Sequence, residues 1–206
     1  MAKEIQTIIF DLGGVLVDWD PAYVFLKRFQ GDREKTNWFL NHVCTSAWNI
    51  EQDAGRSIEK ANRIKIEQFP EYESDIRAFY KEWPHMFAGV IEGTLQIFEA
   101  IKASKKYNYY ALTNWSAETW PTALELFPFF NTFEGVVVSG QEKTRKPYKK
   151  IYDILLNRYT IDAKTAVFID DNLDNVQAAK EMGMQGIHFK NPVQLDMELK
   201  KLGISY

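Results

Sequence analysis

The chain has little of what marks a disulfide scaffold, a membrane protein or a nucleic-acid-binding protein. Its single cysteine, Cys44, cannot form a disulfide within the chain, which agrees with a reducing compartment. No hydrophobic run approaches the ~20 residues needed to cross a bilayer. The 25 basic and 28 acidic residues give a net charge of −3, and the basic residues are scattered, so nucleic acid is not an expected partner.

Residues 1–4 carry no signal-peptide pattern, because they lead directly into a strand-like segment. These absences predict a cytoplasmic protein without membrane or nucleic-acid partners, and oligomeric state leaves no mark in the sequence. With 46% hydrophobic and 26% charged residues, the chain has the composition of a globular protein that can bury a sizeable core.

Five short apolar segments have the pattern of buried strands, and helix-like segments separate most of them. The strand-like segments are residues 5–10, 109–112, 135–138, 165–169 and 186–189. Strands that are apolar on both faces are typical of a parallel sheet covered by helices on each side. The sequence therefore predicts an α/β fold with a Rossmann-like parallel sheet.

Residues 20–85 interrupt this pattern with charged and aromatic residues that show no strand alternation. Asp20 and Pro21 have the character of a helix N-cap and a first helical residue. Turn signals at 31–32, 53–55 and 69–70 divide the segment into four short helices. We expect a core domain of residues 1–19 and 86–206 and an inserted, all-helical cap of residues 20–85. A helical subdomain with no role in the site is the alternative.

Polar side chains follow four of the predicted strands, where a parallel sheet brings its carboxyl ends to one edge. Carboxylates hold hard cations such as Mg²⁺, and a lysine with a hydroxyl binds an anion. Phosphoryl transfer depends mainly on such positioning and electrostatics. The residues concerned are Asp11 with Gly13 and Gly14, Thr113 with Asn114, Lys146, and Asp170 with Asp171.

Each of these residues also has a purely structural interpretation. Asp11 could cap its strand, Asp171 could be a helix N-cap, and Thr113 could simply end a strand. Lys146 lies in a basic loop that solvent could surround, and Lys143 is the alternative lysine. The combination of these residues favours a site over the separate structural interpretations.

Other reactive or aromatic residues carry weaker signals. Cys44 lacks the partners of a nucleophilic cysteine, and the helical spacing around Tyr152 predicts a core residue. We expect all histidines to be structural, because none has the spacing of a metal site or a catalytic triad. Three tryptophans are candidates to line a pocket facing the cap. The histidines are His42, His85 and His188, and the tryptophans are Trp19, Trp48 and Trp115.

Four motifs together resemble the haloacid dehalogenase superfamily of hydrolases. They are residues 10–16 (Phe-Asp-Leu-Gly-Gly-Val-Leu), residues 112–114 (Leu-Thr-Asn), Lys146-Pro147 with Tyr152, and residues 168–172 (Phe-Ile-Asp-Asp-Asn). Their order and spacing resemble the family over residues 8–183, and residues 20–85 resemble its C1-type cap. The resemblance is strongest to the sugar-phosphate phosphatase branch that includes a bacterial α-glucose-1-phosphate phosphatase.

The resemblance implies a role for each matching position. Asp11 would be the nucleophile that forms an aspartyl-phosphate. Mg²⁺ would be held by Asp11, the Gly13 carbonyl and Asp171, with Asp170 acting through water. Thr113 and Lys146 would bind the transferring phosphoryl group, assisted by Asn114 and by the glycine-turn amides, including that of Gly14.

Gly13 departs from the family's pattern, because most of its phosphatases carry a second aspartate two residues after the nucleophile. That aspartate protonates the leaving group, and general acid–base help is typically worth ~10²–10⁴-fold in rate. The leaving group could depart unaided, or Asp18, Asp20 or a cap residue could supply the proton. A catalytically weak protein is the third account.

The expected function is that of a Mg²⁺-dependent phosphatase acting on a small phosphorylated metabolite, with a sugar phosphate as the leading substrate. The main alternative is a metal-free 2-haloacid dehalogenase, which also lacks the second aspartate. The Asp170-Asp171 pair opposes this alternative, because it would repel a carboxylate substrate. A non-catalytic or catalytically weak binding protein is the remaining alternative.

Overall fold

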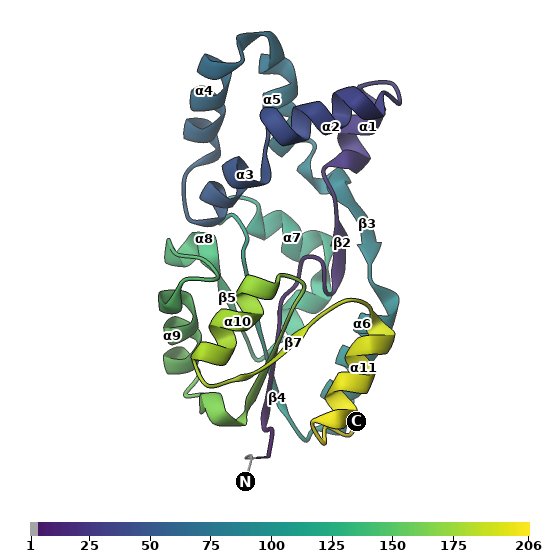
Figure 1. Cartoon of the computed structure of the whole chain (residues 1–206), viewed down its shortest axis with the longest axis vertical. Coiled ribbons are helices and arrows are strands. Elements are labelled where there is room, and N and C mark those ends of the chain that lie inside the picture. Colours follow the sequence, from purple (N-terminus) through teal and green to yellow (C-terminus); the bar gives the residue numbers. More distant parts are fainter. Residues whose placement is uncertain (1–3) are drawn as a thin grey trace.

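The computed structural model describes residues 4–206. Residues 1–3, which begin the predicted core segment 1–19 and the stretch compared with a signal peptide, lie outside the described residues. In Figure 1 a parallel sheet with its helices occupies the lower half of the molecule, and the helices of residues 22–81 gather at the top. No helix within residues 4–206 combines the length and the hydrophobicity needed to cross a membrane.

The main sheet has five parallel strands in the order β5-β4-β1-β6-β7. The chain builds outward from β1 to one edge, and it then returns to the other side of β1. Ligands of open α/β sheets bind at the carboxyl ends of the strands where the order reverses in this way. The strands are β1 (Thr7–Phe10), β4 (Asn108–Thr113), β5 (Gly135–Val138), β6 (Ala166–Asp170) and β7 (Gln185–His188).

Helices cover both faces of this sheet, as the apolar strands predict. Because neighbouring strand residues point to opposite faces, Ile8 and Phe10 of β1 pack with α6 (Glu92–Ser104) and α11 (Pro192–Lys201). Ile9 faces the other side and packs with α9 (Lys149–Arg158) and α10 (Leu173–Glu181). The predicted α/β fold with a Rossmann-like parallel sheet is therefore confirmed. Two shorter helices, α7 (Trp120–Leu126) and α8 (Ser139–Glu142), follow β4 and β5.

Five α-helices, rather than the predicted four, occupy residues 22–81. The break that the sequence analysis missed lies at Thr45, whose side chain accepts a hydrogen bond from the Trp48 amide and starts a new helix. The first helix begins at Ala22 with Pro21 as its N-cap residue, one residue later than predicted, and the Asp20 side chain accepts a hydrogen bond from the Ala22 amide. The helices are α1 (Ala22–Arg28), α2 (Arg33–His42), α3 (Ser46–Asp53), α4 (Ile58–Gln68) and α5 (Glu73–Lys81).

Aromatic side chains fill the interior of this helical group. The rings of Phe25 and Phe39 lie 4.7 Å apart, and Trp48 meets Phe79 edge to face at 5.2 Å. The Trp48 indole N–H donates to the Ala61 carbonyl, so the tryptophan is fully engaged here. Much of the high aromatic content of the chain therefore serves packing.

Two short strands that the sequence analysis did not predict carry the chain into and out of the helical group. β2 (Val17–Trp19) and β3 (Phe87–Val90) pair antiparallel, with a register shift between Asp18 and Trp19 (Figure 1). Segments of three and four residues are too short to show a clear alternation. Their pairing places Trp19 beside the carboxyl end of the main sheet.

Candidate active site

Asp11 follows β1 directly, at the point where the strand order of the sheet reverses. Its Oδ1 accepts a hydrogen bond of 2.7 Å from the Leu12 amide, and its Oδ2 lies 2.8 Å from Lys146 Nζ. The residue is 7% exposed. The carboxylate is therefore held in one orientation, with little water around it.

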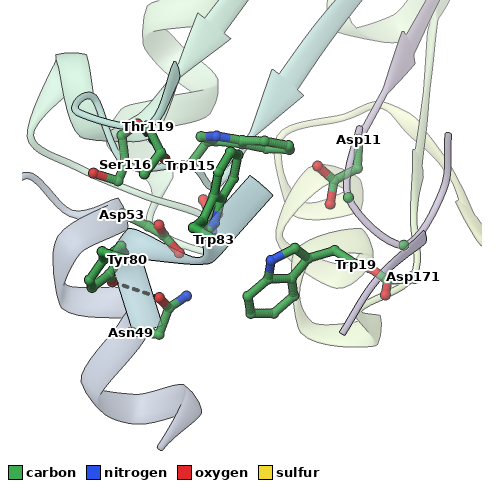
Figure 2. A pocket seen from close by; sticks show the side chains of 13 residues that line it. Asp11, Trp19, Asn49, Asp53, Tyr80, Trp83, Trp115, Ser116, Thr119 and Asp171 are labelled. Atoms are coloured by element: carbon green, nitrogen blue, oxygen red, sulfur yellow. Dashed lines mark hydrogen bonds between the residues drawn. The ribbon is translucent and has the colours of Figure 1, made fainter. Parts of the chain in front are cut away.

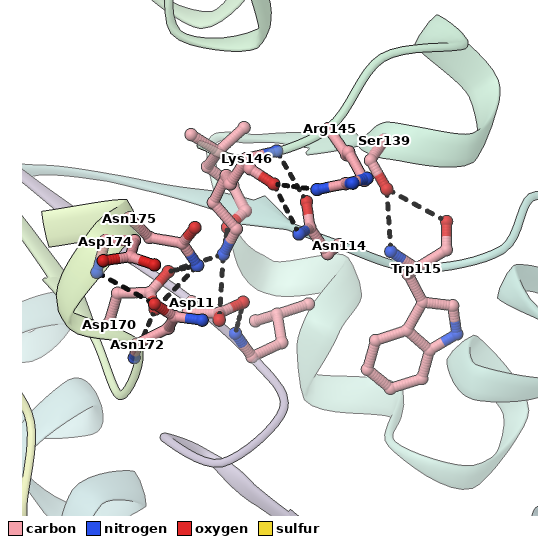
Figure 3. Close-up of polar contacts among 12 residues, drawn as sticks. Asp11, Asn114, Trp115, Ser139, Arg145, Lys146, Asp170, Asn172, Asp174 and Asn175 are labelled. Atoms are coloured by element: carbon pink, nitrogen blue, oxygen red, sulfur yellow. Dashed lines mark hydrogen bonds and ion pairs between the residues drawn. The ribbon is translucent and has the colours of Figure 1, made fainter. Parts of the chain in front are cut away.

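Lys146 is completely buried, and its ammonium group has three partners (Figure 3). Besides Asp11, it contacts Asp170 Oδ2 at 2.7 Å and donates to the Leu112 carbonyl at 2.9 Å. Asn114 fixes the backbone at this position, because it accepts from the Lys146 amide and donates to the Lys146 carbonyl. A buried ammonium ion is stable only when it is paired in this way.

Asp170 ends β6 and is completely buried. Its oxygens accept hydrogen bonds from the Asn172 amide and the Asn175 side chain, in addition to the contact with Lys146 (Figure 3). The Tyr152 hydroxyl donates to the Asn175 carbonyl. Tyr152, predicted as a core residue, therefore helps to position Asn175. Asn175 is a functional candidate that the sequence analysis missed.

Asp171 is exposed, and it approaches the glycine turn after Asp11. Gly14 has a φ of +73°, and a Cβ atom there would lie 2.3 Å from Asp171 Oδ2. Both the left-handed backbone and the close approach therefore require glycine at this position. Gly13 is different, because a Cβ atom would meet only Trp115 Cζ3 at 4.0 Å.

The carboxylates of Asp11, Asp170 and Asp171 each offer an oxygen within 4.8 Å of the others. Burial raises the pKa of Asp11, Lys146 opposes this, and the negative charges of Asp170 and Asp171 raise it further. Burial acts to lower the pKa of Lys146, but Asp11 and Asp170 outweigh it and raise that pKa. Three carboxylates beside one ammonium leave an excess of negative charge, which fits a hard divalent cation.

Thr113 ends β4 beside these residues and is 1% exposed. Within the described part of the chain, its Oγ1 has no hydrogen-bond partner. Buried hydroxyls are normally paired, so this one fits an anion that would accept its proton. The structure thus brings all of the predicted site residues to one edge of the sheet: Asp11, Gly13, Gly14, Thr113, Asn114, Lys146, Asp170 and Asp171.

A pocket of about 210 Å³ opens above this edge, between the sheet and the helical group (Figure 2). Asp11, Gly13, Gly14, Asn114 and Asp171 line it from the main sheet side. Three tryptophans form apolar walls, namely Trp19, Trp83 and Trp115. Polar side chains line the far part: Asn49, Asp53 and Tyr80 from α3 and α5, with Ser116 and Thr119 from the loop after β4.

Two of the three predicted pocket tryptophans therefore line the pocket, and Trp48 does not. Asp18 and Asp20 lie outside the lining, and each accepts a hydrogen bond elsewhere, from Tyr23 and Ala22. Lys143 is exposed, whereas Lys146 is buried in the site, so the geometry favours Lys146 of the two lysines.

Cys44 and the histidines also lie outside the pocket lining. Burial raises the pKa of the Cys44 thiol, which keeps it protonated and unreactive. His188 contacts one of the three aspartates, but only through the backbone. Its Nε2 lies 2.9 Å from the Asp171 carbonyl oxygen. That contact supports the backbone, in keeping with a structural role.

The sequence analysis missed Trp83 and the polar residues Asn49, Asp53 and Tyr80. All four belong to the helical segment or its exit, where no motif marks them. In the sequence, Asp53 is only part of a turn signal. Its position at the last residue of α3, against the loop after β4, becomes visible only in three dimensions.

Comparison with known proteins places the chain among hydrolases. A sesquiterpene phosphatase of Aspergillus oryzae is 26% identical over 98% of both chains. A D-ribitol-5-phosphate phosphatase of Bacteroides thetaiotaomicron is 22% identical over 95% of this chain and 97% of its own. A solved HAD family enzyme from Bacteroides thetaiotaomicron, in complex with magnesium and inorganic phosphate, superposes with a TM-score of 0.67. It is 24% identical and covers 91% of this chain and 95% of its own.

A family model for haloacid dehalogenase-like hydrolases matches residues 5–183, which contain every carboxylate, lysine and hydroxyl described above. The protein is therefore an enzyme that belongs to the haloacid dehalogenase-like hydrolase family.

Proposed function

We propose that this hydrolase is a Mg²⁺-dependent phosphatase that acts on a small phosphorylated metabolite. The observation that carries the proposal is the cluster of three carboxylates around one buried lysine, beside the unpaired hydroxyl of Thr113. The carboxylates suit a divalent cation, and the hydroxyl suits an anion. A phosphate ester coordinated by Mg²⁺ combines these two requirements.

Asp11 is the proposed nucleophile, since it is the carboxylate at the floor of the pocket with a fixed orientation. One of its oxygens would attack phosphorus, the ester oxygen would leave, and water would then hydrolyse the aspartyl-phosphate. The positive charge of Lys146 opposes the rise in the pKa of Asp11 that burial causes, and Thr113 binds the phosphoryl group, with Asn114 and the Gly14 amide assisting.

Asp11, Asp171 and the Gly13 carbonyl are the proposed metal ligands, with Asp170 in the outer shell. When bound, Mg²⁺ supplies positive charge that offsets the charge of the carboxylates and of the transferring oxygens. Lys146 alone cannot do this, because its three partners already use its hydrogens.

The basicity of the leaving group determines how much rate is lost because Gly13 carries no acid. Neither Asp18 nor Asp20 lines the pocket, so neither is placed to donate a proton there, and Asp53, the cap carboxyl that does line it, lies across the pocket from Asp11. A leaving group of low basicity, such as an anomeric sugar oxygen, departs more easily without an acid. A sugar phosphate is therefore the substrate class that we favour.

The pocket supports the proposed division into a core (residues 1–19 and 86–206) and a helical cap (residues 20–85). Asn49, Asp53 and Tyr80 reach the same cavity as Asp11 and Asp171, although they come from the other segment. A cap that lines the pocket can select the leaving group while the core performs the chemistry.

The dehalogenase alternative fits the site less well. A 2-haloacid carries a carboxylate, and the carboxylates of Asp11, Asp170 and Asp171 would repel it. A non-catalytic binding protein would need no fixed nucleophile. Phosphate release from p-nitrophenyl phosphate, with and without Mg²⁺, beside halide release from 2-chloropropionate separates the three functions.

Metal-dependent phosphate release that is lost in Asp11→Asn would support the phosphatase. Metal-independent halide release would favour the dehalogenase and contradict the metal site. Release of neither phosphate nor halide would favour the binding protein. The circular dichroism spectrum of Asp11→Asn must match that of the wild type, so that lost activity reports chemistry and not unfolding.

A further inference from the structure

The pocket narrows the substrate class beyond a phosphorylated metabolite. We propose that Asp53 is a specificity-determining residue that accepts a hydrogen bond from a hydroxyl of the leaving group, so that the enzyme selects phosphorylated sugars or polyols over phosphorylated hydrocarbons. This inference rests on the proposed phosphatase function. It concerns the far part of the pocket, away from the reacting phosphate.

Asp53 is placed to contact the leaving group and not the phosphoryl group. It is the last residue of α3, and it lines the pocket opposite Asp11 with Asn49 and Tyr80 near it (Figure 2). The Ser116 backbone contributes one hydrogen bond to its carboxylate. None of the ion pairs found among residues 4–206 involves Asp53. A carboxylate has about four acceptor positions, so most of its capacity remains for a ligand.

The groups near Asp53 leave acceptor positions of its carboxylate free. Burial raises its pKa to about 7, and the positive charges of Arg145 and Lys146 only partly oppose this. Tyr80 cannot supply the donor, because its hydroxyl already donates to Asn49 Oδ1 at 2.7 Å and accepts from Gln52. A ligand hydroxyl would therefore donate to the acceptor positions that the Ser116 backbone and Tyr80 leave free.

The rest of the pocket agrees with a sugar or polyol. The rings of Trp19, Trp83 and Trp115 offer apolar surfaces against which the C–H groups of a sugar can pack. A volume of about 210 Å³ is below the ~300–1,000 Å³ of typical pockets for drug-sized ligands, which suits a small leaving group.

A long isoprenoid chain would match the tryptophans but would desolvate the Asp53 carboxylate without pairing it. Buried polar groups without partners are costly, so the polar end of the pocket disfavours a hydrocarbon. This distinction matters, because one of the relatives named above is a sesquiterpene phosphatase and another is a D-ribitol-5-phosphate phosphatase.

The alternative role for Asp53 is to hold the helical group closed through Ser116. The experiment separates the two roles with a matched substrate pair, ribitol 5-phosphate and pentyl phosphate, which differ in the hydroxyls of a five-carbon chain. We expect Asp53→Leu to lower the ratio of their kcat/KM values at least tenfold, mainly through the KM of ribitol 5-phosphate. Asp53→Asn keeps an acceptor oxygen, and it should recover part of the ratio.

Two control variants calibrate this ratio. Glu51→Gln removes an exposed carboxylate from the same helix, and the ratio should not change. Glu118→Ala removes the hydrogen bond from the Ile58 amide to Glu118, which links the helical group to the sheet side outside the pocket. It should affect both substrates alike.

A ratio that stays constant in Asp53→Leu while both rates fall would overturn the proposal and assign Asp53 to closure. Faster turnover of farnesyl phosphate than of ribitol 5-phosphate by the wild type would also overturn it. Calorimetric titration of the two matched ligands into Asp11→Asn, with and without Asp53→Leu, measures the same preference without turnover. A wild type that releases no phosphate from p-nitrophenyl phosphate but retains this binding preference would contradict the phosphatase and keep the subsite.

Discussion

Lys146 Nζ lies 2.8 Å from Asp11 Oδ2 and 2.7 Å from Asp170 Oδ2, so one ammonium ion joins the carboxyl ends of two neighbouring strands. The lysine comes from the loop after a third strand, β5, and all of its ammonium hydrogens have partners. It therefore links the stability of the sheet edge to the orientation of the proposed nucleophile.

Lys146→Met should damage both stability and activity. It removes one partner of a buried charge cluster and leaves Asp11 and Asp170 side by side, which costs about 3–5 kcal/mol of unfolding free energy. Urea denaturation measures this loss. Lys149→Met is the matched control, because that lysine is exposed and its pair with Asp153 contributes about 1 kcal/mol or less. Equal losses in the two variants would contradict the structural role of Lys146.

Gly14→Ala should weaken Mg²⁺ activation, because the new Cβ would collide with Asp171 Oδ2 and displace that carboxylate. The positive φ adds backbone strain of about 1–2 kcal/mol. Gly31→Ala separates the two effects, since Gly31 also has a positive φ, and a Cβ there has nothing within 4 Å. Both variants should lose stability, but only Gly14→Ala should need more Mg²⁺ for half-maximal activity. A similar Mg²⁺ requirement in both would argue against the placement of Asp171 at the metal.

The sequence predicted the sheet and its edge well, because both depend on local patterns. Continuous apolar segments such as 166–169 are typical of strands buried on both faces, and parallel strands bring Asp11, Thr113 and Asp170 to one edge. The short strands β2 and β3 were missed, since three or four residues show no alternation and are held by pairing with each other.

The far part of the pocket could not be predicted for a different reason. Asn49, Asp53 and Tyr80 meet the core only through the packing of α3 and α5, and their spacing in the sequence carries no motif. Trp48, by contrast, was predicted as a pocket residue but lies inside the helical group, where its ring packs against Phe79 and Tyr80. Which face of a short amphipathic helix meets the core is a tertiary property.

Gly13→Asp should restore a general acid and raise kcat on primary alkyl phosphates, with a gain of up to ~10²–10⁴-fold. The position accepts a side chain, because a Cβ would find only Trp115 Cζ3 at 4.0 Å and φ lies outside the left-handed region. The gain on p-nitrophenyl phosphate should be much smaller, since its leaving group needs no proton.

Gly13→Asn controls for size and polarity, because an amide cannot donate a proton as a carboxylic acid does. An equal gain from the Gly13→Asn variant would mean that acid catalysis by the introduced carboxyl group is not the cause. Equal wild-type rates on alkyl and aryl phosphates would show instead that another residue already supplies the proton.

The raised pKa of Asp53 predicts a pH-dependent effect on stability. Its ordinary value is 3.8, and burial raises it to about 7 in the folded protein, against the opposing charges of Arg145 and Lys146. Between these values the folded state binds more protons than the unfolded state, so the contribution of Asp53 to stability falls as the pH rises from about 4 to about 7. Asp53→Asn removes this titration. Its free energy of unfolding, relative to the wild type, should therefore increase from pH 4 to pH 8.

The same titration should appear in substrate selection. The ionised carboxylate is the stronger acceptor, so the wild-type preference for ribitol 5-phosphate over pentyl phosphate should rise as the pH increases through about 7. The two substrates share the titration of their phosphate groups, which cancels in the ratio of kcat/KM values. Asp53→Asn should make that ratio independent of pH. A wild-type ratio that stays flat between pH 6 and pH 8, together with an unchanged pH profile of stability in Asp53→Asn, would mean that the Asp53 carboxylate is not desolvated by the pocket.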